Sequence, residues 1–117
     1  MSHQFAPGDD LVFQLESGLG LLRVIAIEGD GATTVWHLLA YDEFFPDVES
    51  AERALQTESL RVRQPHMALT NRAFERTPAA RLGNRPVHDE ELAGYRAWLA
   101  SDRKVSDRSA LLLLGIR

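Results

Sequence analysis

The four histidines of this chain are the residues best suited to acid–base or metal chemistry near neutral pH, and their spacing supports neither. His66 and His88 have no histidine partner four residues away, so the helical zinc-binding pattern is absent. His37 lies in a stretch rich in apolar residues, which favours a histidine packed in the core. A hydrolase that pairs His37 with a carboxylate is a third hypothesis, and it requires His37 to face a cleft. The sequence predicts no catalytic residue, metal ligand or cofactor.

An acidic stretch with two adjacent phenylalanines, residues 42–52, is the stronger candidate for function. Its carboxylates lack the alternating register of a calcium loop, and nothing nearby separates two carboxyl pKa values as acid–base catalysis requires. One interpretation is a solvated loop whose phenylalanines turn into the core. The other is an acidic docking surface with aromatic anchors, which would steer and hold a basic partner protein. The predicted partner-binding residues are Asp42, Glu43, Phe44, Phe45, Asp47 and Glu49.

Arginines between positions 61 and 85 give the second half of the chain a positive charge, whereas the first half is negative. The first 58 residues carry eleven acidic and two basic side chains, and the remaining residues carry six acidic and eleven basic ones. Interpreted as a nucleic-acid patch, the arginines have only Phe74 for base stacking. The alternative is pairing with the acidic half, within one chain or between copies in a homo-oligomer. The candidate nucleic-acid residues are Arg61, Arg63, Arg72, Arg76, Arg81 and Arg85.

The composition is typical of one small globular domain. The chain has 117 residues, of which 44% are hydrophobic and 26% charged, enough for a single core. It has no cysteine, which excludes disulfides and thiolate chemistry. The first residues lack the pattern of a secretory signal, and no apolar run approaches the roughly 18 residues of a membrane span. We expect one cytoplasmic domain, residues 1–117, that does not associate with membranes.

The elements that position these residues begin with a predicted antiparallel meander at residues 9–41. Residues 10–16 alternate between apolar and polar side chains, as a half-buried strand does. A turn with two glycines follows, and then the dense apolar run of residues 21–28, which predicts a central strand covered on both faces. A Gly-Asp-Gly turn leads to residues 33–41, which are rich in β-branched and aromatic side chains.

The rest of the chain predicts fewer regular elements. Residues 42–56 are expected to form the acidic loop and a short helix capped by Ser50. Within the arginine-rich segment 59–86, residues 59–63 alternate as a strand does, and residues 66–69 are expected to extend or resume that strand after Pro65. Residues 70–86 are expected to be mostly irregular, with a short edge strand near 73–76. Residues 88–102 predict a helix. The apolar tail 110–116 best fits a buried final strand, with a buried helical turn as the alternative.

Together these elements predict an α+β fold. The expected architecture is a bent antiparallel sheet or partly open SH3-like small barrel of four to six strands. One C-terminal helix at about 88–102 and the short final strand would complete it.

The start of the chain carries a family resemblance. The segment GDDLVFQL at residues 8–15 is followed by GLGLLRV at residues 18–24. This order resembles the start of the immunity protein 26-type families of bacterial toxin systems, which open with Gly-Asp, an alternating strand, a glycine-containing turn and a Gly-Arg-Val-like strand. Leu22 stands where that pattern has glycine before Arg23. The resemblance covers residues 8–45 and implies a small β-barrel that binds a partner and has no catalytic residues.

The leading hypothesis is therefore a non-catalytic protein-binding module that uses the acidic aromatic loop. An immunity-like inhibitor of a basic toxin is its most specific form. A nucleic-acid-associated small barrel that uses the arginine-rich segment is the alternative.

Overall fold

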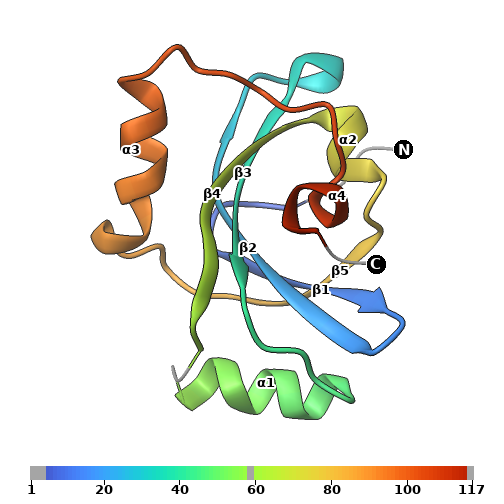
Figure 1. The fold of residues 1–117 in the computed structure, drawn as a ribbon. Coiled ribbons are helices and arrows are strands. Elements are labelled where there is room, and N and C mark those ends of the chain that lie inside the picture. Colours follow the sequence, from blue (N-terminus) through green and yellow to red (C-terminus); the bar gives the residue numbers. More distant parts are fainter. Residues whose placement is uncertain (1–4, 58–59, 116–117) are drawn as a thin grey trace.

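The structure, a computed structural model, describes residues 5–57 and 60–115 and contains one five-stranded antiparallel sheet (Figure 1). The strand order is β4-β3-β2-β1-β5, and the sheet is open, with β4 and β5 at its edges. The strands are β1 (Asp9–Leu15), β2 (Gly18–Glu28), β3 (Val35–Tyr41), β4 (Val62–Thr70) and β5 (Ala79–Asn84). This confirms an α+β fold with an antiparallel sheet, and its first three strands form the predicted meander.

Short helices connect and cover the strands. The predicted helix at 88–102 is present over residues 89–99, as a 3₁₀ turn followed by α3, and Leu92, Tyr95, Trp98 and Leu99 on it are half-buried. The helical elements are η1 (Gly31–Thr33), α1 (Val48–Thr57), α2 (Asn71–Glu75), η2 (Asp89–Leu92), α3 (Ala93–Leu99) and α4 (Ala110–Leu114). None of the helices in the described part of the chain has the length and apolarity needed to cross a membrane.

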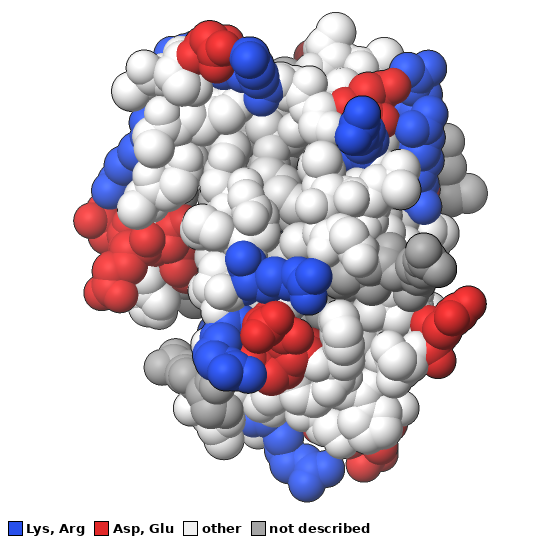
Figure 2. Space-filling view, in the orientation of Figure 1, with Lys and Arg blue, Asp and Glu red and all other residues white. Residues whose placement is uncertain are grey.

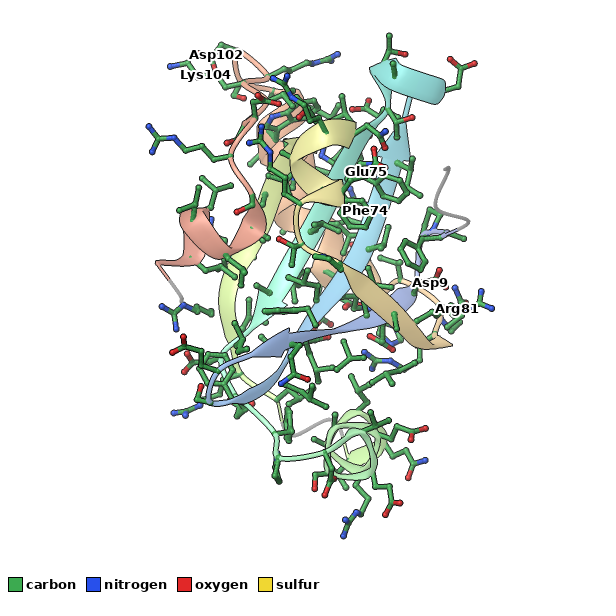
Figure 3. All side chains as sticks on the ribbon, turned by 90° about the vertical axis from the view of Figure 1, so that its right-hand side faces the viewer. Asp9, Phe74, Glu75, Arg81, Asp102 and Lys104 are labelled. Atoms are coloured by element: carbon green, nitrogen blue, oxygen red, sulfur yellow. The ribbon has the colours of Figure 1, made fainter. Side chains whose placement is uncertain are left out.

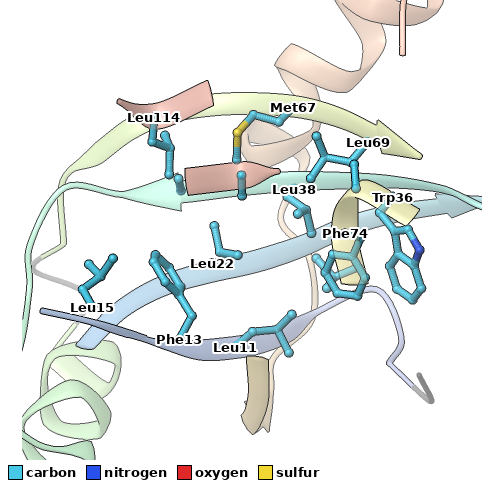
Figure 4. Packing of buried hydrophobic residues seen from close by; sticks show 14 residues of the cluster. Leu11, Phe13, Leu15, Leu22, Trp36, Leu38, Met67, Leu69, Phe74 and Leu114 are labelled. Atoms are coloured by element: carbon cyan, nitrogen blue, oxygen red, sulfur yellow. The ribbon is translucent and has the colours of Figure 1, made fainter. Parts of the chain in front are cut away.

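The sheet buries apolar side chains on both faces, because successive residues of a strand point to opposite sides. One face packs against Phe74 of α2 and Leu114 of α4 (Figure 4). The other face packs against Ala51 and Leu55 of α1 and Tyr95 of α3. The helices α3 and α4 therefore lie on opposite faces of the sheet, and both contact the edge strand β4.

The predicted final strand at 110–116 is wrong, because residues 110–114 form helix α4. The Ser109 hydroxyl accepts a hydrogen bond from the Leu112 amide at 3.4 Å, and Gly115 ends the helix with φ of +68°. A serine cap and a left-handed glycine delimit a helix more strongly than an apolar run indicates a strand. Residue 116 lies outside the described residues.

The predicted edge strand near 73–76 is also wrong. Residues 71–75 form α2, whose first turn is capped by the Thr70 hydroxyl, an acceptor for the Ala73 amide at 3.1 Å. This turn places the Phe74 ring on Trp36, with ring centroids 4.2 Å apart. The edge strand follows later in the chain, as β5.

Candidate functional site

The acidic aromatic loop, residues 42–49, connects β3 to the start of α1 (Figure 1). Backbone hydrogen bonds fix this loop. The Phe45 amide donates to the Leu19 carbonyl at 2.8 Å, and the Phe45 carbonyl accepts from the Leu19 amide at 2.7 Å. Phe45 is half-buried and packs against the α1 side of the core. Phe44 is 39% exposed. The two phenylalanines thus separate into one core residue and one surface residue.

The carboxylates of this loop hold its shape. Glu43 accepts hydrogen bonds from the Arg61 amide at 3.0 and 3.1 Å and from its guanidinium at 3.2 Å. Asp42 lies 3.8 Å from the guanidinium nitrogens of Arg61 and Arg63. Asp47, instead of the predicted Ser50, caps α1 by accepting from the Ser50 amide at 2.7 Å, and this bond lowers the pKa of Asp47.

The six arginines predicted as a nucleic-acid patch lie at three places. They are at the start of β4 (Arg61, Arg63), on α2 and its C-terminal end (Arg72, Arg76), and on β5 and directly after it (Arg81, Arg85). At the start of β4, Arg61 lies beside Asp42 and Glu43, and Arg63 lies beside Asp42. At α2, Arg72 pairs with the Asp107 carboxylate and Arg76 donates to the Asp107 carbonyl. At β5, Arg81 pairs with Asp9 and Arg85 pairs with Asp10. Figure 3 shows one such pair, Arg81 and Asp9. Four of the six arginines therefore pair with the acidic half of the same chain.

Arg23, in the centre of β2, is fully buried and uses every donor of its guanidinium. Its Nε donates to the Glu91 carboxylate at 2.5 Å. One terminal nitrogen donates to the Gly8 carbonyl at 2.9 Å and to the Asp10 carboxylate at 3.3 Å. The other terminal nitrogen donates to the carbonyls of residues 85 and 86, directly after β5, at 3.1 and 3.0 Å. Arg85 binds the same Asp10 carboxylate at 2.7 and 2.9 Å. Arg23, Asp10 and Arg85 thus join β1, β2 and the segment before α3.

A hydrogen-bonded chain of Glu28, His37 and His66 lies on the face that α3 covers. The Nε2 of His37 is 2.8 Å from a Glu28 carboxylate oxygen, and its Nδ1 is 2.9 Å from Nε2 of His66. A carboxylate only accepts, so Nε2 of His37 carries the proton and Nδ1 accepts from His66. The rings of Tyr95 and Trp98 lie 4.6 Å from His37, centroid to centroid.

The environment of the histidine pair keeps both rings neutral at pH 7. Burial lowers the pKa of His37 although Glu28 opposes the shift. Burial and the neighbouring His37 lower the pKa of His66 to about 4. A general base works best when its pKa is close to the working pH, and the pKa of His66, about 4, is far below it. His37 has the carboxylate partner of the hydrolase hypothesis but is fully buried and faces no cleft.

A hollow of about 490 Å³ lies beside His66, along the outer edge of β4. Trp98 of α3 and Leu113 of α4 contribute to its lining, together with β4 residues between them. Figure 2 shows this face, which is mostly uncharged between the two helices. Sequence reasoning missed the hollow because its walls come from three separate segments. It also missed the Glu28–His37–His66 chain, whose only sequence signal is a histidine in each of two strands.

Among the described residues, no group of three or more His, Asp or Glu side chains is placed to hold a metal ion. Comparison of the chain with known protein families, curated proteins and solved structures finds no match. The geometry of the loop, the hollow and the charges is therefore the basis for a functional proposal.

Proposed function

We propose that this chain is a non-catalytic protein-binding module that docks a basic partner protein on the acidic aromatic loop and the start of α1. The observation that carries the proposal is Phe44, which is 39% exposed on a loop held by hydrogen bonds. Val48, 41% exposed, begins α1 four residues further along. An aromatic side chain on a pre-ordered loop is a typical binding hot spot, because little conformational entropy is lost when it is buried.

The charges around Phe44 favour a partner whose contact surface is basic. Asp47, Glu49 and Glu52 are exposed along the loop and α1, and Arg53 is the one basic residue in the sequence from 42 to 57. Such a surface raises the association rate with a basic protein and selects its orientation, an effect that salt screens. Asp42 and Glu43 contribute less to it, because Arg61 already pairs with both.

An immunity-like inhibitor that neutralises a basic toxin is the most specific form of this proposal. The resemblance of residues 8–45 to the immunity protein 26-type families supports it. We also propose that the fold is an SH3-like, partly open barrel. The bent open sheet with the strand order β4-β3-β2-β1-β5 is compatible with such a barrel.

Partner capture with matched variants tests the proposal. The wild-type chain and the double variant Phe44→Ser, Glu49→Arg are immobilised and exposed to the same cell extract. The control is Leu112→Ser, which removes an apolar side chain that is 68% exposed on α4. We expect a basic protein to bind the wild type and the control, to be lost from the double variant, and to elute at moderate salt. Equal capture by the double variant, or loss only with Leu112→Ser, would overturn the proposal.

A further inference from the structure

The open edge of β4 is a second surface with features of a binding site. On one side β4 pairs with β3, and on the other the described residues pair with it only at Ser106. There the Ser106 amide donates to the Ala68 carbonyl at 2.8 Å, and the Thr70 amide donates to the Ser106 carbonyl at 2.9 Å. Ser106 therefore already pairs with one end of this edge as a strand would. The rest of the edge, residues 62–67, has no strand beside it in the described chain, and open edges accept added strands. Pro65 has no amide to donate, and the His66 carbonyl also accepts from the Gln64 side chain at 3.0 Å, so an added strand would use the amides on either side of Pro65.

The helices on either side turn this edge into a slot. Trp98 of α3 lies against His37 on one face of the sheet, α4 with Leu113 covers the other face, and both side chains line the hollow of about 490 Å³. The Trp98 ring is fixed by its Nε1, which donates to the Lys104 carbonyl at 2.7 Å. Gly94 brings α3 close to β4, since a Cβ there would lie 2.8 Å from Cβ of His66. The slot therefore has an apolar side chain on each side of β4.

From this geometry we propose that the β4 edge binds an extended peptide segment as an added strand. Successive side chains of a strand point to opposite faces, so adjacent peptide residues would contact Trp98 and Leu113 in turn. The bound segment therefore has a run of adjacent apolar residues. The lining contains the side chain of Lys104, whose ammonium lies 3.6 Å from the exposed Asp102 carboxylate, and no carboxylate of its own. An acidic peptide residue beside Lys104 would compete with Asp102 for this cation, so we expect an acidic residue in the preferred sequence.

This surface is separate from the Phe44 loop, so the two proposals fail independently. The probe is a display library of random eight-residue peptides, selected on the full-length chain. We expect enriched peptides that combine adjacent apolar residues with an acidic one. Leu113→Asp should weaken the best peptide about tenfold or more, and Lys104→Glu should remove the preference for the acidic residue. Phe44→Ser is the matched control and should leave peptide affinity unchanged.

Methylation of the peptide backbone distinguishes strand addition from other modes of binding. In an added strand, alternate amides donate to β4 and the others face away. Methylating an amide that faces β4 should weaken binding about tenfold, the loss expected when a hydrogen bond is removed and its acceptor is left unpaired. Methylating the intervening amides should change affinity less than twofold. Failure to enrich any peptide, or an affinity that does not alternate with the methylated position, would overturn the proposal, whatever the folding of the variants.

Discussion

The titration of His66 links the stability of this fold to pH. Burial and the neighbouring His37 lower the pKa of His66 to about 4 in the folded chain, against an ordinary value of about 6.5 in an unfolded one. The unfolded chain therefore binds a proton that the folded chain resists. The stabilising contribution of neutral His66 is complete above pH 6.5 and is lost as the pH falls from 6.5 towards 4.

The shift sets the size of the effect. Each unit of pKa difference corresponds to about 1.4 kcal/mol, so lowering the pH from 7 to 4.5 would cost roughly 2.4 kcal/mol if His66 were shielded from water. His66 is only half-buried, and solvent screening reduces the expected loss to about 1.5 kcal/mol.

Urea unfolding, followed by tryptophan fluorescence between pH 7 and 4.5, measures this loss in the wild type and in His66→Gln. Glutamine can still donate to Nδ1 of His37 but does not titrate. The wild type should lose about 1.5 kcal/mol more than the variant over this range. Carboxyl groups with lowered pKa values titrate in both proteins and cancel in the comparison; they are Asp47, Asp89, Glu91 and Asp107. Parallel pH profiles for the two proteins would refute the reasoning.

Three substitutions test the structural network by the same unfolding assay. Arg23→Leu should cost about 3–5 kcal/mol, because it leaves buried carboxylates and carbonyls without their donor; a loss below about 1 kcal/mol would contradict that role. Gly8→Ala should be destabilising by at least about 1–2 kcal/mol, because φ is +94° and the new Cβ would lie 2.4 Å from the Arg85 carbonyl. Gly83→Ala is its control, with nothing within 4 Å, and a similar loss in both would refute the steric argument. Ser109→Ala should cost about 1 kcal/mol through the lost cap of α4, and unchanged stability would contradict that capping role.

Local signals made the first three strands predictable from the sequence. Alternation at residues 10–16 and the turns that follow residues 16 and 28 specify strand, hairpin and strand without help from distant residues. The sequence also contains local signals for helix α4, a serine cap at Ser109 and a terminating glycine at Gly115. The prediction followed the apolar run between them instead and gave a strand.

The candidate sites depended on contacts that no local pattern specifies. His37 meets His66 because β3 pairs with β4 across the intervening helix α1, and a register set across such an insertion is not encoded in either strand alone. Arg23 sits within an apolar run, and its buried charge is stabilised by groups from residues 8, 10, 85, 86 and 91, all distant in the sequence. The exposure of Phe44 beside the half-buried Phe45 likewise depends on the pairing of the loop with Leu19.

The most direct test of a protein-binding function is a hydrogen–deuterium exchange footprint of the chain with its captured basic partner. The account predicts slowed exchange in residues 42–57, centred on the loop that carries Phe44, and loss of that protection in the Phe44→Ser, Glu49→Arg variant. A footprint that leaves residues 42–49 unprotected while the partner remains bound would contradict the account.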